Sequence, residues 1–468
     1  MNFKMLKNRT LNSALWYTLS NIIAKGISLL LTPVFTRILT KGQYGIYTNF
    51  VSWQNILVTV FSLELSSTIL RARFDYKDDA EFSGYVYTIA LFGMLFSCSL
   101  IGAISALLKF DLKTVLGIDN KFAFMLCCII VFSPLLQLFQ AEQRAEIKYK
   151  LSSLITLLYG ISTFGFPFLI MSIKDDKLYS LFLGMTINAV FWGGAIFGYY
   201  FRCKKSKVKK EYIFYGLNIA LPIVPHLISN IIMGNSDKLM ISYYCGADFT
   251  AMYGVVYTCA LAITLLRNSL NSAWVPWFYE KMESKDYEKI LTISKIFLEI
   301  FSVGSILMCL LGPEIVMFLG GSQYREAVYL MPIIMLGCYY NFVYLFYVNI
   351  EFYEKKTIMI SVITIITAVL NIFLNSMFII RFGYSAAAYT TAFCNFIIVV
   401  FHYFVTKKMG NYKVCNNRQI FSFCALACVA AIICIISYKF SILRYILFAL
   451  MILMSVRIIT KDDIKKLF

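Results

Sequence analysis

The residues of this sequence that could do chemistry are polar side chains set at helical spacing inside long apolar segments. Steps of three or four residues place such side chains on one face of a helix. A polar face in hydrocarbon must meet protein or water. It therefore predicts either a Ser/Thr contact between helices or a hydrated cavity. The first segment carries Thr18, Asn21, Lys25, Ser28, Thr32 and Thr36, and the second carries Thr48, Ser52, Asn55, Thr59, Ser62 and Ser66.

Two cations favour the cavity. Lys25 lies about midway along the first segment, where an ammonium costs about 3 kcal/mol unless it faces water or an anion. Arg267 lies in the eighth segment on one face with Asn271 and Trp274. The alternative for Arg267 is that its guanidinium reaches the cytoplasmic interface, where Trp274 and Trp277 would form an aromatic belt. We interpret Lys25 and Arg267 as cavity cations.

The seventh segment combines helix-breaking and polar residues. Pro222 and Pro225 remove backbone donors and can kink the helix. A kinked, polar helix suits a gate, and a static kink with a satisfied core His226 is the alternative. The polar residues of this segment are Asn218, His226, Ser229, Asn230, Asp237 and Lys238.

Carboxylates at membrane depth are few, and they are Glu64, Glu299 and Glu351. Asp237 lies nearer an outer end. A carboxylate that titrates inside the membrane could couple transport to protons. A structural ion pair is the alternative, and for Glu64 the partner would be Arg71 or Lys25.

About fourteen apolar segments position these residues, and almost nothing lies between them. The 468 residues give about 33 per segment, and about 20 apolar residues span a bilayer. Hydrophobic residues make up 60% of the chain and charged residues 15%, against about 25% in soluble domains. We therefore expect an all-α polytopic membrane protein without a soluble catalytic domain. The segments are roughly 11–36, 42–70, 83–108, 121–140, 151–173, 178–201, 213–235, 248–275, 290–311, 328–350, 357–380, 384–406, 419–438 and 441–459.

The net charge of +18 reflects membrane topology rather than nucleic-acid binding, because the charges lie in loops beside apolar segments. With the N-terminus in the cytoplasm, inner connections hold 29 Lys and Arg residues and outer connections hold 12. Positive loops stay inside. This bias predicts an even number of spans with both termini cytoplasmic. The first segment is too long for a cleaved signal peptide.

An internal repeat indicates two halves. Ser20-Asn21-Ile22-Ile23 recurs as Ser229-Asn230-Ile231-Ile232, and Tyr44-Gly45 recurs at the same offset as Tyr253-Gly254. The basic stretch Arg202–Lys210 lies between the halves, as a topology signal or as a site that attracts anionic lipid. We expect a six-helix lobe at 1–201, a basic cytoplasmic linker at 202–212, a second six-helix lobe at 213–406 and two additional helices at 407–468.

Soluble-enzyme motifs are absent. The chain has no P-loop, no His-Glu-x-x-His and no Gly-x-Ser-x-Gly, which excludes a built-in ATP motor and argues against an enzyme. The thirteen cysteines are scattered without a Cys-x-x-Cys, and there are two histidines. We therefore expect no catalytic residue, no disulfide, no metal site and no cofactor.

Five stretches carry a family resemblance: Leu11–Asn21, Leu31–Tyr47, Ser236–Ile241, Met252–Tyr257 and Ala273–Tyr279. With them the chain resembles the Wzx-type flippases of lipid-linked oligosaccharides, which belong to the multidrug/oligosaccharidyl-lipid/polysaccharide exporter superfamily. The resemblance covers essentially the whole chain. Its motifs are diffuse, so they indicate the family better than the substrate.

The resemblance implies two six-helix lobes around a V-shaped central cavity, lined by spans one, two, seven and eight, plus two C-terminal helices. It implies alternating access that moves an undecaprenyl-diphosphate-linked glycan from the inner to the outer leaflet of the bacterial cytoplasmic membrane. The product would be O-antigen, capsule or another surface polymer. The drive would be H+, Na+ or the membrane potential. We expect a monomer in the lipid bilayer, with other glycan-assembly membrane proteins as candidate partners.

In such a cavity Lys25 would bind the diphosphate through its compact ammonium charge. Arg267 would bind it through the several N–H donors of its planar guanidinium. The residues expected to contact the sugars are Asn21, Asn55, Asn230, Asn268, Asn271 and Trp274. Those expected to gate the cavity or couple an ion are Glu64, Arg71, His226, Asp237 and Lys238.

Three other functions remain open at this stage. A drug or metabolite antiporter of the same superfamily usually needs only twelve spans and uses buried carboxylates. A membrane glycan polymerase or ligase usually carries one long outer loop, whereas the longest outer connection here has about 15 residues. A scaffold or scramblase of a glycan-assembly complex would support assembly without driven transport.

Overall fold

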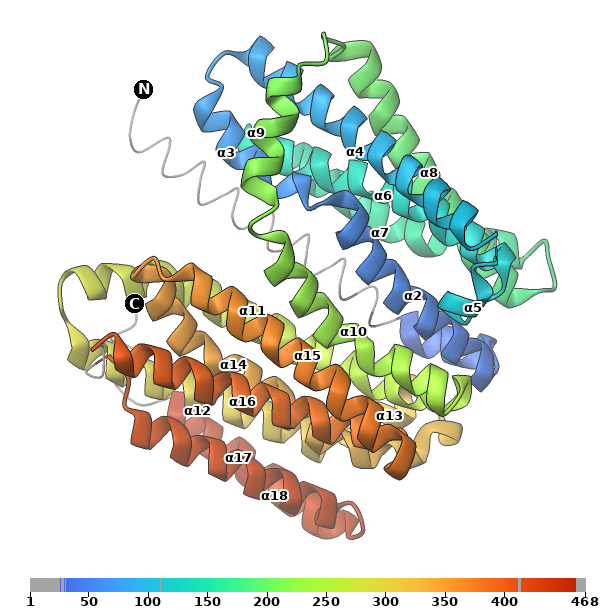
Figure 1. The fold of residues 1–468 in the computed structure, drawn as a ribbon. Coiled ribbons are helices and arrows are strands. Elements are labelled where there is room, and N and C mark those ends of the chain that lie inside the picture. The colour runs from blue at the N-terminus through green and yellow to red at the C-terminus, as the bar shows by residue number, and fades with distance from the viewer. Residues whose placement is uncertain (1–25, 27–28, 30, 110, 411–413, 460–468) are drawn as a thin grey trace. The chain divides into compact units, whose positions relative to one another are not determined.

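The chain is helical throughout the described part of a computed structural model, which covers residues 26, 29, 31–109, 111–410 and 414–459 (Figure 1). These residues contain no strand. Ten helices among them are long and apolar enough to cross a membrane, and twelve spans result when each of two bent helix pairs counts as one. The predicted all-α membrane fold is confirmed. Most of the first predicted segment, 11–36, lies outside the described residues.

The helices divide into two compact units. One contains Met1–Leu31 and Ile46–Asn235, and the other contains Thr32–Gly45 and Ser236–Phe468. Two helices, α2 (Lys41–Ser62) and α10 (Val224–Tyr244), each carry the chain from one unit into the other. The units therefore do not coincide with the lobes expected at 1–201 and 213–406, whose bounds stay a prediction.

The first unit is built around one central helix, α6. It packs against α3, α4, α7 and α8, and more than half of its apolar stretch is buried. Its apolar side chains fill two core clusters with those of its neighbours. Besides parts of α2 and α10, the unit contains η1 (Leu65–Thr68), α3 (Ile69–Asp75), α4 (Asp79–Leu107), α5 (Lys113–Leu116), α6 (Asn120–Ala145), α7 (Tyr149–Met171), α8 (Lys177–Cys203) and α9 (Lys210–Ala220).

A buried carboxylate fixes the start of the basic linker to this unit. Glu142 of α6 is fully buried and accepts a hydrogen bond from the Tyr200 hydroxyl, 2.8 Å away. Its other oxygen pairs with the ammonium of Lys204, the residue that follows α8. A charge this deep needs a close partner of opposite sign. The pair therefore holds the linker against the ends of α6 and α8.

The second unit also has a central helix, α14 (Met331–Tyr353), which packs against α11, α12, α15, α16 and α17. Sixteen of its residues are buried, and most of them are apolar. The other elements are α11 (Ala247–Glu283), α12 (Tyr287–Leu310), α13 (Gly312–Gly320), η2 (Ser322–Leu330), α15 (Thr357–Phe382), α16 (Ala386–Lys408), α17 (Asn417–Ser437) and α18 (Ser441–Ile459).

The last two helices, α17 and α18, are fastened to the second unit by polar contacts. Arg444 of α18 forms a two-pronged ion pair with Glu314 of α13. Tyr438, between α17 and α18, donates to the Cys309 carbonyl of α12 at 2.6 Å. The two helices expected C-terminal to the second lobe are thus present and packed.

Helices α7 and α8 approach closely at a glycine. A Cβ added at Gly184 of α8 would lie 2.4 Å from the backbone nitrogen of Pro167 in α7. Only a residue without a side chain allows that distance. Gly194, ten residues further along α8, has no atom within 4 Å of such a Cβ. The two glycines therefore form a matched pair of test sites.

We predict that Gly184→Ala lowers the melting temperature of the purified protein, because overpacking a closed contact costs about 1–3 kcal/mol. Gly194→Ala is the control and is expected to melt like the unmodified protein. Equal melting temperatures for the two variants would contradict the packing of α7 on α8.

Candidate functional site

The polar stripe of α2 divides into a packed part and an exposed part. Thr48, Ser52 and Thr59 are buried, and Ser52 and Thr59 donate to carbonyls one turn earlier in the same helix. These hydroxyls are therefore satisfied without a ligand. Asn55 is exposed, and its amide lies 3.3 Å from Oδ1 of Asn235 in α10. Asn55 is the residue of this stripe that remains available to a polar ligand.

The bend that follows α2 is sharp and strained. Helix α2 and the segment Leu65–Asp75 meet at 51°. Leu63 and Glu64 between them both have φ of 48°, in the left-handed region that costs a residue with a side chain about 1–2 kcal/mol. Strain of this kind is retained where the surrounding structure requires it and clusters at functional sites.

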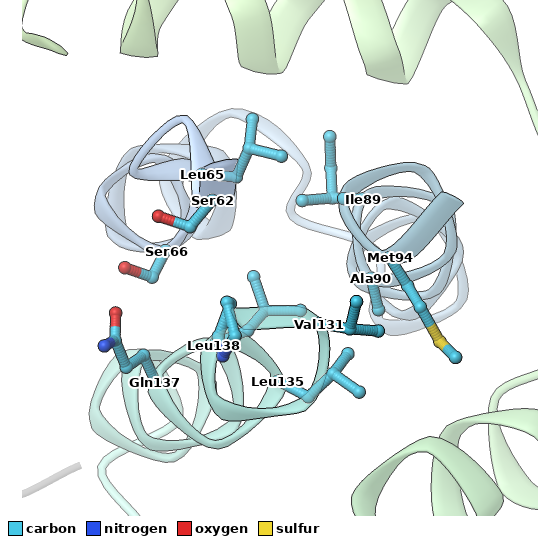
Figure 2. A pocket seen from close by; sticks show the side chains of 12 residues that line it. Ser62, Leu65, Ser66, Ile89, Ala90, Met94, Val131, Leu135, Gln137 and Leu138 are labelled. Atoms are coloured by element: carbon cyan, nitrogen blue, oxygen red, sulfur yellow. The ribbon is translucent and has the colours of Figure 1, made fainter. Parts of the chain in front are cut away.

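A small cavity of about 30 Å³ lies behind this bend, between α2–η1, α4 and α6. Figure 2 shows that its polar side chains, Ser62, Ser66 and Gln137, face one another at one side, while leucine, isoleucine and methionine line the rest. The free volume and the strained backbone coincide.

The predicted kink in the seventh span is present as a second bend. Helices α9 and α10 meet at 54° around Leu221–Ile223, where Pro222 lies. His226 is partly buried, and its Nε2 lies 3.1 Å from the amide nitrogen of Asn230, one turn later on α10. Asn230 itself is exposed. The proline signal in the sequence thus located the bend to within a turn.

The two broken spans are joined on both sides of their bends. Tyr215 of α9 donates to Asp75 at the end of α3, with 2.6 Å between oxygens, and Asn55 of α2 contacts Asn235 of α10. Arg71 pairs with Asp75 at 2.9 Å. Of the two partners considered for Glu64, Arg71 thus pairs with Asp75, an acid one turn along the same helix, and Lys25 lies outside the described residues.

Asp237 is the most deeply embedded of the predicted ion-coupling residues. It lies on α10, is 1% exposed, and accepts hydrogen bonds from the Tyr253 hydroxyl at 2.6 Å, the Asn375 amide at 2.7 Å and the Thr391 hydroxyl at 2.8 Å. Asn371 donates to Thr391 and accepts from Ser236. Helices α10, α11, α15 and α16 thus surround one carboxylate with neutral oxygen and nitrogen groups.

Lys238 follows Asp237 but contacts a different group. Its ammonium lies 4.0 Å from the ring centroid of Tyr257 on α11, in a cation–π contact. The ammonium stays close enough to compensate the Asp237 charge without occupying its hydrogen-bonding positions. Neutral hydroxyl and amide donors therefore stabilise the Asp237 carboxylate, and Lys238 forms no direct ion pair with it.

Arg267 anchors a polar face on α11. Its guanidinium hydrogen-bonds to Asn341 of α14 and to the neighbouring Asn268, and Asn341 donates to Asn395 of α16 at 3.4 Å. One turn further along α11, Asn271 accepts from Asn349 of α14 at 2.9 Å. Arg267 is partly exposed and Asn268 is exposed. No described carboxylate forms an ion pair with Arg267, so its charge remains available to an anion.

Trp274 lies behind this face and not in an aromatic belt. It is 3% exposed, and its ring contacts Phe278, Phe297 and Phe346 at centroid distances of 5.2–5.5 Å. With Asn271 it borders a cavity of only about 10 Å³. In this conformation the ring supports Asn271, and its expected contact with sugars stays a prediction.

Two predicted site residues, Asn21 and Lys25, lie outside the described residues. The sequence analysis missed Asn341, Asn349, Asn371 and Asn375, which hold the predicted residues in place. Each is an amide inside an otherwise apolar segment, and this sequence pattern could have identified all four. Within the described ranges no group of three or more His, Cys, Asp and Glu side chains could hold a metal ion.

A family model described as "Polysaccharide biosynthesis protein" matches residues 10–282, more than half of the chain. The chain belongs to this family. A protein of the Lsg locus of Haemophilus influenzae, protein 1, is 21% identical over 374 residues, which cover 76% of this chain and 88% of that protein.

Solved structures show the same fold at low identity. The MATE multidrug transporter DinF-BH, solved with a bound ligand, has a TM-score of 0.62, is 13% identical, and covers 88% of this chain and 96% of its own. An inward-facing MATE transporter of the MOP superfamily has a TM-score of 0.60, 11% identity and coverages of 85% and 95%. A MOP superfamily transporter from Pyrococcus furiosus has a TM-score of 0.52, 10% identity and coverages of 85% and 96%.

Family and fold agree with the resemblance stated from the sequence, which is thereby confirmed. The chain is a multi-pass membrane protein of the polysaccharide biosynthesis family, and its fold is the one seen in MOP superfamily transporters. The finer expectations about substrate, direction and coupling concern properties that neither family nor fold determines.

We predict that Glu64→Gly unfolds at a higher temperature than Glu64→Ala. Both variants remove the carboxylate, but only glycine adopts the left-handed backbone of this position without strain. The expected difference is about 1 kcal/mol. An alanine variant that melts as high as the glycine variant would show that the bend is not strained in the folded protein.

Proposed function

We propose that this protein is a flippase that moves an undecaprenyl-diphosphate-linked oligosaccharide from the inner to the outer leaflet of the bacterial cytoplasmic membrane. The family supports the glycan as cargo, and the transporter fold supports movement across a bilayer. The observation that carries the proposal is the α11 face, where Arg267 presents an uncompensated cation beside the amides of Asn268 and Asn271.

This face suits the two chemical parts of a glycan diphosphate. A guanidinium binds phosphate oxygens through several N–H donors in a fixed geometry, and each charge-assisted hydrogen bond is worth about 1.5–3 kcal/mol. Primary amides both donate to and accept from sugar hydroxyls. The hydrogen bond from Arg267 to Asn341 orients the guanidinium in advance, which lowers the entropic cost of binding. Lys25, on the first span, would add a second cation.

Release of the glycan lipid and return of the empty transporter require alternating access. We propose that the ion that drives this change binds at Asp237. Tyr253, Asn375 and Thr391 all donate to the Asp237 carboxylate, which can exchange these hydrogen bonds for a proton or for a hard monovalent cation such as Na+. Binding would change the hydrogen bonds that α10 makes with α11, α15 and α16. Because α10 also continues into the first unit, its movement would reach the bend at Pro222.

The proposed orientation places both termini in the cytoplasm, as the distribution of Lys and Arg predicts. The basic linker and the Glu142–Lys204 pair then lie at the cytoplasmic surface. We propose that the protein acts as a monomer, with other membrane proteins of glycan assembly as partners.

The variant Arg267→Ala tests the substrate directly. In a strain that lacks the protein, we expect radiolabelled lipid-linked glycan to accumulate on the inner leaflet. The unmodified gene restores delivery to the outer leaflet, and Arg267→Ala is expected to reduce the rate about ten- to a hundredfold, which corresponds to the loss of one charge-assisted phosphate contact. Lys25→Ala is expected to reduce it in the same direction.

The control is Arg381→Ala, which removes an arginine at the end of α15, outside the proposed site. It should restore delivery fully at equal expression. Normal outer-leaflet delivery in the strain without the protein would contradict the substrate assignment. Drug-efflux assays would then test the antiporter alternative.

The variant Asp237→Asn tests the coupling site. Translocation by the unmodified protein in sealed vesicles should accelerate on imposing either a Na+ gradient or a pH gradient, and the gradient that acts identifies the ion. Asp237→Asn keeps the hydrogen-bonding shape but removes the charge, so the acceleration should disappear. Asp248→Asn, on an exposed part of α11, should retain it. A variant at Asp237 that still responds fully would exclude this carboxylate from coupling.

A further inference from the structure

The second unit contains a buried acid–base pair that the proposed function does not use. Nδ1 of His402 on α16 lies 2.6 Å from Oε1 of Glu351 on α14, and both side chains are 0% exposed. The remaining polar atoms, Oε2 of Glu351 and Nε2 of His402, are also buried and make no hydrogen bond within the described residues. An unpaired buried polar atom costs about 1–3 kcal/mol. A pair with only a structural role would therefore destabilise the fold through its two unpaired atoms.

The pair is closed off by aromatic side chains. The ring of Tyr344, two turns before Glu351 on α14, lies 5.8 Å from the imidazole of His402. Tyr347 and Tyr403 contact each other alongside and lean toward α17, where Tyr347 donates to Asn417. These contacts isolate the pair from water in this conformation.

The neighbouring helices bring no other charge into contact with the pair among the ion pairs of the described residues. Lys407 of α16 lies over the ring of Tyr403, and Tyr344 is the titratable group against the imidazole. The charged residues on the helices packed around α14 and α16 are Asp248, Arg267, Glu280, Lys281 and Glu283 of α11, Glu288, Lys289, Lys295 and Glu299 of α12, Arg325 and Glu326 of η2, Arg381 of α15 and Arg418 of α17.

The same turn of α14 reaches the proposed substrate face. Asn349, two residues before Glu351, donates to Asn271 of α11 at 2.9 Å, while Asn341 of the same helix contacts Arg267. A shift of the last turns of α14 would therefore change the amide that Asn271 presents. The pair and the α11 face are connected through one rigid helix.

We propose that Glu351 and His402 form an occluded proton-binding site, in which Nε2 of His402 takes up the exchangeable proton. Without that proton, Nδ1–H donates to the Glu351 carboxylate, Nε2 carries a lone pair, and the pair has a net charge of −1. With it, the imidazolium and the carboxylate compensate each other, and the pair is neutral. The pair binds and releases one proton, and no other bond forms or breaks.

Burial makes the loaded form the stable one in this conformation. A net charge inside a low-dielectric interior costs several kcal/mol, whereas a hydrogen-bonded neutral pair avoids that cost. Release therefore requires a movement that admits water to Nε2. The pair is a second ion site besides Asp237, and its proton binding does not depend on which substrate the protein carries.

The small number of histidines makes the test direct. The chain has two, so His226→Gln leaves His402 as the sole source of histidine signals. In 15N-histidine-labelled His226→Gln protein in nanodiscs, we expect the Nε2 resonance to report one protonation step as the pH is varied. Adding Glu351→Gln should lower the proton affinity of His402 at least about tenfold, which moves the step by one pH unit or more.

Glu351→Asp is the matched variant, because it keeps the charge but withdraws the carboxylate, and it should move the step in the same direction by less. Its measurement also decides the matter if Glu351→Gln does not fold. Absence of any protonation step in the protein with Glu351 intact would show a static pair. A step that neither substitution moves would show that Glu351 does not stabilise the proton on His402. Either result overturns the proposal.

Discussion

The structure depends on one constraint: a polar group inside a membrane protein must find its partner within the protein or in a hydrated space. The described units obey it through a network of amides. Asn341, Asn349, Asn371 and Asn375 each connect two helices, and they position Arg267, Asn271 and Asp237. Such contacts contribute only about 0.6 kcal/mol each on average. Their number therefore reflects positioning more than stability.

The same constraint explains where the helices bend. A break in a span frees backbone groups, and both breaks lie in the first unit. Ser62 accepts from the backbone of Glu64 at the first break, and Pro222 has no donor to satisfy at the second. The helices that precede or follow these breaks, α2 and α10, carry the chain into the second unit.

The sequence predicted the helices well because about 20 apolar residues in a row have few alternatives. Pro222 located one bend, but the bend at Leu63–Glu64 carries no proline or glycine, and no local pattern indicates it. The spacing of polar residues along one helix face predicted Asn55, Arg267 and Asn271 as site residues. It could not separate them from Ser52 and Thr59, whose hydroxyls bond to their own helix. Pairing between distant helices, such as Glu351 with His402, depends on packing that one segment does not encode.

The most direct test of the proposed flippase uses purified protein in vesicles and two fluorescent lipids. Both carry the same oligosaccharide on a polyprenyl chain, but one has a diphosphate linkage and the other an uncharged linkage. A quencher added outside measures how fast each lipid reaches the outer leaflet. A cationic α11 face predicts rapid translocation of the diphosphate lipid and little of the uncharged one. Equal rates for the two lipids, or no acceleration of either, would contradict it.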